Sequence, residues 1–250
     1  MPTYMDRKRY LVVMAAGHGT RMGAELPKQF LSLSGKAILH RTIQKFINAV
    51  PGINVVTVLP PDGEHVAWWK NYCRENNFIC PQIIVKGGIT RFHSVRAALE
   101  KVPDGALVAV QDGVRPMISE ALIKKMFGVF AENEDIHALI PVTPMVDTLK
   151  LLRRTKDGNG NVLLSGLDGE VPDREKIFAA QTPQIFRSEE LKAAYGQAYD
   201  TAFTDDASVA AGYKIPLTYC EGERLNFKIT SPDDLVLAEA VLKIRSKVRG

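Results

Sequence analysis

The sequence predicts an α/β fold: a Rossmann-like, mostly parallel sheet with helices on both faces and a projecting β-hairpin arm. Apolar runs rich in β-branched residues alternate with amphipathic stretches along most of the chain, and one segment interrupts this order. The 250 residues, 46% of them hydrophobic, are enough for one substantial core. We therefore expect one domain over residues 1–250.

Strands and helices alternate through the first half of the chain. Short apolar runs predict strands at 10–16, 53–60, 82–87, 106–112 and 137–142. Amphipathic stretches between them predict helices at 35–50, 65–77, 90–102 and 119–132. Strands joined through helices run parallel, and a parallel sheet is normally buried on both faces.

The segment at 143–176 departs from this alternation. Two apolar runs within it flank Lys-Asp-Gly-Asn-Gly-Asn at 156–161, a turn-forming sequence typical of a β-hairpin. An isolated hairpin is only marginally stable in water, so an exposed one needs a partner surface. We expect this arm to join two copies of the chain in a homodimer.

Helices and strands resume after the arm. The pattern predicts helices at 188–200, 206–212 and 232–247, and strands at 215–220 and 226–230. Ser231 is a favourable N-cap, and Pro232 suits the first turn of the last helix.

Composition excludes several classes of protein. No window approaches the roughly 20 consecutive apolar residues of a membrane span, and the N-terminus lacks a secretory signal, so we expect a cytoplasmic protein without a membrane partner. A net charge of +4, with scattered Lys and Arg, argues against a nucleic-acid partner. The three cysteines form no C-x-x-C pair, which excludes a zinc site of that type.

A glycine-rich loop follows the first strand. The loop, Ala15-Ala16-Gly17-His18-Gly19, lies where an α/β fold binds ligands, and backbone amides there can cradle phosphates. The glycines alone are more typical of an ordinary strand-exit turn, and a single Lys or Arg is usually a solvated charge. Arg21 and Lys28 together strengthen the case, because two cations beside an amide cradle suit a triphosphate.

The residues from 15 to 39, which begin AAGHGTRMGAELPKQF, resemble the signature of the 2-C-methyl-D-erythritol 4-phosphate cytidylyltransferase family. Further segments match that family in order and spacing: GGITRFHSV at 87–95, DGVRP at 112–116, PVTPMVDTLK at 141–150, AQTPQIF at 180–186, TDDAS at 204–208 and NFKIT at 226–230. The resemblance implies the nucleotide-diphospho-sugar transferase type of fold, transfer of CMP from CTP to 2-C-methyl-D-erythritol 4-phosphate in isoprenoid precursor synthesis, and a requirement for Mg²⁺ or another divalent cation.

The resemblance also implies a nucleotide site. Its expected members are Ala15, Ala16, Gly17, Gly19, Arg21, Lys28, Gly88, Ser94 and Asp112. Arg21 and Lys28 are expected to hold the phosphates and stabilise the transition state, and Asp112 to lie beside CTP and the metal ion. Gly88 and Ser94 match positions that contact the cytosine and the ribose.

The acceptor site is likewise implied by resemblance. Thr148, Arg174, Thr182 and Lys228 match positions that bind the acceptor, and Arg174 and Lys228 are assigned catalytic roles with Arg21 and Lys28. Relatives reach across a dimer with the arm, so each active site is expected to borrow Thr148 and Arg174 from the neighbouring subunit.

Three alternatives differ in activity. D-ribitol 5-phosphate cytidylyltransferases are similar in sequence and differ in the acceptor, and Val114 resembles some of them. Gln111 stands where the family commonly has histidine, so no role that rests on that histidine is carried over. A non-catalytic nucleotide-binding subunit would keep the fold without turnover, yet Arg21, Lys28, Asp112 and Lys228 are all retained. An NAD-dependent oxidoreductase would need a complete G-x-G-x-x-G and a later acidic residue.

Overall fold

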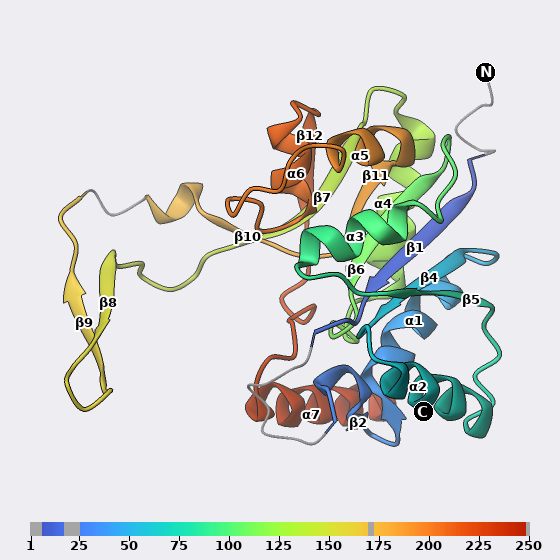
Figure 1. The fold of residues 1–250 in the computed structure, drawn as a ribbon, viewed down its shortest axis with the longest axis horizontal. Coiled ribbons are helices and arrows are strands. Elements are labelled where there is room, and N and C mark those ends of the chain that lie inside the picture. Colours follow the sequence, from blue (N-terminus) through green and yellow to red (C-terminus); the bar gives the residue numbers. More distant parts are fainter. Residues whose placement is uncertain (1–6, 18–25, 170–172, 249–250) are drawn as a thin grey trace.

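The computed structural model describes residues 7–17, 26–169 and 173–248 (Figure 1). Its main feature is an eight-stranded sheet in the order β10-β7-β11-β6-β1-β4-β5, with β12 paired to β7. The strands of this sheet are β1 (Arg9–Met14), β4 (Asn54–Leu59), β5 (Gln82–Lys86), β6 (Leu107–Asp112), β7 (Ala138–Pro144), β10 (Phe178–Ala180), β11 (Gln184–Arg187) and β12 (Leu217–Glu221).

Most pairings in the sheet are parallel, as the sequence predicts. β1 pairs in parallel with β4 and β6, β4 with β5, and β12 with β7. β11 is antiparallel to both β6 and β7, and β10 is antiparallel to β7. The α/β class with a mostly parallel sheet is therefore confirmed.

Helices cover both faces of the sheet. One apolar cluster packs α1 (Ile38–Ala49), α2 (Gly63–Glu75) and α4 (Glu120–Glu132) against one face. A second packs α3 (Arg91–Leu99), α5 (Ser188–Ala194) and α6 (Asp206–Gly212) against the other. A third, smaller cluster lies under α7 (Pro232–Val248). None of the helices in the described ranges is long and apolar enough to cross a membrane.

The arm is a two-stranded hairpin that stands away from the sheet (Figure 1). Its strands, β8 (Leu152–Lys156) and β9 (Val162–Gly166), pair antiparallel, and their residues are exposed. Asp157 closes the turn by accepting hydrogen bonds from the backbone and side chain of Asn161. A short 3₁₀ turn, η4 (Arg174–Lys176), lies on the return path to β10.

Three local predictions differ from the structure, and in one of them the helix expected at 188–200 already ends at Ala194. The segment at 226–230, expected to be a strand, has no strand pairing; it is an extended loop fixed by a bond from the Ile229 amide to the Val114 carbonyl. The helix expected at 35–50 begins only at Ile38, because a small hairpin, β2 (Ser32–Leu33) and β3 (Lys36–Ala37), precedes it. Ser34 and Gly35 have positive φ, which suits the hairpin turn.

Candidate active site

A cavity of about 550 Å³ opens at the carboxyl ends of the parallel strands. β1 and β6 end together, with Met14 opposite Asp112. The cavity is lined by Met14, Ala15, Ala16, Gly17, Lys28, Gln29, Pro61, Gly88, Ile89, Thr90, Arg91, Ser94, Asp112, Val114 and Lys228. Eight of the residues predicted from sequence thus meet in one place: Ala15, Ala16, Gly17, Lys28, Gly88, Ser94, Asp112 and Lys228. Gly19 and Arg21 lie outside the described residues.

Small residues next to those that line this cavity bring backbone segments close together. A Cβ on Gly87 would lie 2.5 Å from the Ala16 Cβ, and a Cβ on Gly113 would lie 2.9 Å from the Met14 carbonyl oxygen. Neither position can take a side chain without displacing its neighbours. The ends of β1, β5 and β6 can therefore approach one another only with glycine at these sites.

Asp112 is the centre of a charged cluster. Its Oδ2 lies 3.0 Å from Arg115 Nε and 3.2 Å from Lys228 Nζ. Burial by itself would raise the pKa of Asp112, but the charges of Lys228, Arg115 and Arg91 outweigh it and hold the pKa at about 2. Asp112 is therefore a carboxylate at every physiological pH. The loop bearing Lys228 is fixed to the same cluster, since Arg115 Nη1 donates to the Asn226 carbonyl at 2.8 Å.

Arg91 is fixed by hydrogen bonds to a buried carboxylate. Its two terminal nitrogens donate to Asp206 at 2.8 and 2.5 Å, and Tyr195 donates to the same carboxylate at 2.6 Å. Burial would lower the pKa of Arg91, but Asp206 raises it further than burial lowers it. The guanidinium thus stays charged while it lines the cavity, and it links α3 to α6.

The Ser94 hydroxyl organises the loop that follows β5. It accepts a hydrogen bond from the Gly88 amide at 2.9 Å and donates to the Thr90 carbonyl at 2.9 Å. The hydroxyl's single proton is therefore engaged within the loop, and one acceptor position remains for a ligand. Thr90 also caps α3 by accepting from the His93 amide.

The expected acceptor residues are spread over the chain. Thr182 is buried beside the cavity, where its hydroxyl accepts from the Asp112 amide at 3.0 Å. Thr148 and Arg174 are exposed on the two branches of the arm, and Arg174 donates to the Val146 carbonyl at 3.3 Å. Neither of these two arm residues lines the cavity of its own chain, within the part that the structure describes.

The donor set fits a magnesium ion only together with phosphate oxygens. Within 7–17, 26–169 and 173–248, no three His, Cys, Asp or Glu side chains gather to hold a metal ion. Magnesium commonly takes one or two carboxylates, several waters and substrate phosphates. Asp112 can supply one carboxylate, and both of its ion pairs use Oδ2. The residues therefore suit a metal that arrives with the triphosphate.

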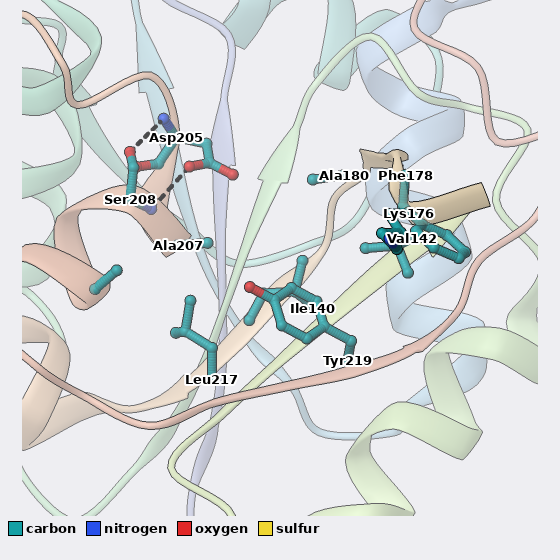
Figure 2. Close-up of a pocket in the computed structure, with 11 residues that line it drawn as sticks. Ile140, Val142, Lys176, Phe178, Ala180, Asp205, Ala207, Ser208, Leu217 and Tyr219 are labelled. Atoms are coloured by element: carbon teal, nitrogen blue, oxygen red, sulfur yellow. Dashed lines mark hydrogen bonds between the residues drawn. The ribbon is translucent and has the colours of Figure 1, made fainter. Parts of the chain in front are cut away.

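A second cavity, of about 640 Å³, lies at the base of the arm between β7, β12 and α6 (Figure 2). Its lining is mainly apolar, with Ile140, Val142 and Leu217 among its members. At its edge, Asp205 and Ser208 bond to each other's backbone amides and cap α6. None of the predicted site residues that the structure describes lines it, and an apolar wall does not suit a triphosphate.

Sequence reasoning placed the main residues of the first cavity but omitted several that support it. Arg115 stands in the DGVRP segment, so that motif could have indicated it. Asp206 stands in TDDAS, and its partner Arg91 in GGITRFHSV, but nothing local signals that these two segments meet. Tyr195 carried no signal at all, because a tyrosine on an amphipathic helix is ordinarily a core residue.

Fold and cavity together define the class of a nucleotidyltransferase: an α/β protein with cations and close-set backbone at the carboxyl ends of its strands. Residues 10–244 match the sequence profile of the family described as "IspD: 2-C-methyl-D-erythritol 4-phosphate cytidylyltransferase". A curated relative of that description from Porphyromonas gingivalis is 44% identical over 239 residues, which is 95% of this chain and 99% of the relative. One from Bacteroides thetaiotaomicron is 38% identical, over 94% of this chain and 100% of the relative.

Solved structures of enzymes with the same description are also similar to this chain. The 2-C-methyl-D-erythritol 4-phosphate cytidylyltransferase of Thermus thermophilus has 30% identity and a TM-score of 0.67, over 94% of this chain and 99% of that one. The corresponding enzyme of Francisella tularensis has 28% identity and a TM-score of 0.69, over 93% and 99%. The chain belongs to the 2-C-methyl-D-erythritol 4-phosphate cytidylyltransferase (IspD) family of enzymes.

Proposed function

We propose that the cavity at the carboxyl ends of β1, β5 and β6 transfers CMP from CTP to 2-C-methyl-D-erythritol 4-phosphate, in the synthesis of isoprenoid precursors. An oxygen of the acceptor phosphate forms a bond to the α-phosphorus of CTP. The bond from that phosphorus to the oxygen of the β-phosphate breaks, and pyrophosphate leaves. The observation that carries the proposal is the meeting of Lys28, Asp112 and Lys228 in one cavity.

The acceptor phosphate needs no general base. A phosphate monoester has a second pKa near ~6, so at neutral pH it is already a dianionic nucleophile. The obstacle is repulsion between two anions. Lys28, Lys228 and Arg91 supply positive charge at the cavity wall, and the backbone of Ala15, Ala16 and Gly17 supports the nucleotide.

Gly88 lies in the loop after β5 and Ser94 in the first turn of α3, and in this proposal both contact the cytosine and ribose. A Cβ on Gly88 would lie 2.7 Å from the His93 Cβ, so this position takes only glycine unless its neighbours move. Arg21 and Gly19 complete the phosphate site in this proposal. When bound, magnesium would withdraw charge from the phosphates, and Asp112 is the carboxylate that would hold it.

The active protein in this proposal is a homodimer in which the arm at 143–176 of each chain reaches the cavity of the other. Thr148 and Arg174 are exposed on the arm and lie off their own cavity, so they are available to a partner. Arg174 suits an acceptor phosphate, because its planar guanidinium can make two parallel hydrogen bonds. Thr182 and Lys228 would contact the acceptor from the cavity's own chain.

Release of pyrophosphate tests the function. The purified chain with CTP and MgCl₂ is expected to turn over 2-C-methyl-D-erythritol 4-phosphate much faster than D-ribitol 5-phosphate, and to require the divalent cation. Faster turnover of the ribitol phosphate would assign the other acceptor. No turnover of either, with the protein folded, would contradict the proposed function.

A further inference from the structure

The side chain of Gln29 joins two parts of the candidate active site that are separate in sequence. Gln29 follows Lys28 in the 3₁₀ turn η3 (Lys28–Phe30), and it is 1% exposed. Its Nε2 donates to the Ala15 carbonyl at 2.7 Å and to the Gly17 carbonyl at 2.9 Å. These two bonds use both protons of the amide.

The direction of these bonds matters for an anionic ligand. A carbonyl oxygen carries partial negative charge and repels a triphosphate, whereas an amide proton attracts it. Two carbonyls of the loop that lines the cavity are turned to the Gln29 amide, which neutralises part of their charge. By donating to both carbonyls, the buried Gln29 amide sets which way the loop's peptide groups face.

The same turn is anchored on its other side. Phe30 is buried, and its ring centroid lies 4.7 Å from that of Trp68 and 6.3 Å from that of Trp69. Lys28, which lines the cavity, thus stands next to a residue bonded to the loop, within a turn that is packed against α2. The position of Lys28 relative to Ala15 and Gly17 is fixed through Gln29.

We propose that Gln29 is a positioning residue for nucleotide binding, which sets the glycine-rich loop and Lys28 at the spacing that a triphosphate requires. This inference rests on the proposed function of the cavity, since it assumes that the ligand is CTP. Gln29 acts through the loop and Lys28 and takes no part in the chemical step. It is distinct from the acceptor site, so its effect should fall on CTP.

Gln29→Glu tests the donor role, because the introduced carboxylate has the same shape but presents oxygen to two carbonyls. At pH 8, CTP affinity in MgCl₂, measured by calorimetry, and kcat/KM for CTP are expected to fall at least about tenfold, as for one or two lost buried hydrogen bonds. KM for the acceptor should change little. At pH 5.5 the carboxyl can take up a proton and donate. The ratio of the variant's CTP affinity to that of the wild type should therefore be higher than at pH 8.

Gln82→Glu is the matched control. Gln82 is half-buried away from the cavity, where its Oε1 accepts from Thr57 and Trp69 and its Nε2 donates to the Cys80 carbonyl at 3.5 Å. Gln82→Glu therefore makes the same exchange of an amide for a carboxylate at a distance from CTP. The ratio of the CTP affinity of Gln82→Glu to that of the wild type should not depend on pH. Gln29→Met, which removes the donor without adding charge, should weaken CTP binding at both pH values alike.

Circular dichroism at each pH corrects the affinities for the folded fraction. CTP affinity equal to wild type in Gln29→Met, which adds no charge to the cavity wall, would overturn the inference. A ratio for Gln29→Glu that stays constant with pH would also overturn it. Wild-type turnover distinguishes the two proposals. If the wild type binds CTP but makes no product, the proposed reaction fails, and the affinity ratios still decide the role of Gln29.

Discussion

At the scale of single residues, Asp112 shows how the cavity keeps charge of both signs. The carboxylate is buried, and two cations contact the same oxygen. An isolated buried carboxylate would be strongly unfavourable, and so would Arg115 and Lys228 facing each other without it. The three groups therefore stabilise one another, and removing any of them changes both the stability and the shape of the site.

The low pKa of Asp112 predicts a pH-dependent contribution to stability. A carboxyl with a folded pKa of about 2 and an unfolded value of 3.8 stabilises the fold above about pH 4, and the contribution is lost as the pH falls toward 2. Its full size is about 2 kcal/mol. The difference in unfolding free energy between wild type and Asp112→Asn, measured with urea, should be constant from pH 7 to 5 and shrink at pH 3.

Asp135→Asn, at an exposed position, serves as the control for this series and should show no comparable change. A difference for Asp112→Asn that stays the same from pH 7 to 3 would contradict the assignment of the low pKa to this carboxyl.

Lys28 belongs to the same scale, because one side chain supplies its charge to the phosphates. Lys28→Ala is expected to lower turnover at least about a hundredfold, since losing one donor to a developing charge commonly costs ~3 kcal/mol. Steady-state release of pyrophosphate checks this. Lys70→Ala, on the exposed face of α2, should leave turnover unchanged. Near-normal turnover in Lys28→Ala would remove Lys28 from the transition-state role.

At the scale of secondary-structure elements, α3 and α6 are joined by a buried ion pair in addition to apolar packing. Asp206 is fully buried against Arg91, and Tyr195 supplies a third hydrogen bond. Asp206→Asn leaves the guanidinium without its counter-charge, so we expect a loss of about 3–5 kcal/mol in unfolding free energy. Chemical denaturation followed by circular dichroism measures it.

An exposed pair provides the comparison. Asp104 contacts Lys192 at 2.7 Å while its side chain is 72% exposed. Asp104→Asn should therefore change the unfolding free energy by less than about 1 kcal/mol. If Asp104→Asn and Asp206→Asn lowered the unfolding free energy equally, burial of the Arg91–Asp206 pair would add nothing to its stabilising effect.

The helices and strands also show which parts of the fold sequence patterns predict and which parts they do not. The buried parallel strands and the hairpin arm were predicted, because long apolar runs and turn-forming residues act locally. β11 was missed: four residues are too short for a clear period, and its place between β6 and β7 depends on partners distant in the chain. The segment at 226–230 alternates like a strand, yet its groups bond to Arg115 and Val114 instead of a neighbouring strand.

In the candidate site, too, some residues were predicted from sequence and others were not. Lys28, Asp112 and Lys228 were found through motifs in register, and they meet in the cavity. Gln29 stood inside a recognised motif without a role, because its two bonds to Ala15 and Gly17 exist only once β1 and η3 are folded together. Supporting residues of this kind have no chemistry of their own for a sequence pattern to reveal.

At the scale of the whole molecule, the arm exposes apolar side chains on both of its strands. Leu152, Leu163 and Leu164 on its two strands are 47%, 50% and 63% exposed. A hairpin with exposed leucines on both strands favours a covering partner, and a second copy of the same chain supplies one by symmetry. This supports the proposal that two chains share their active sites.

Shared sites predict complementation between two inactive variants. Lys28→Ala disables the chain that provides the cavity, and Arg174→Ala disables the chain that provides the arm. In a mixed dimer one site carries both changes and the other carries neither. Equal mixing after reversible unfolding should therefore restore about a quarter of wild-type turnover, because half of the dimers are mixed and each has one intact site.

The control mixes Lys28→Ala with Asp112→Asn. Lys28 and Asp112 line one cavity of one chain, so every site in that mixed dimer keeps one defect, and turnover should stay at the level of the separate variants. Restoration in the first mixture alone would establish that Arg174 acts across the dimer. If neither mixture recovers while exchange of subunits is verified by mass spectrometry, Arg174 serves its own chain, and the arm must bend back toward the cavity to bring it there.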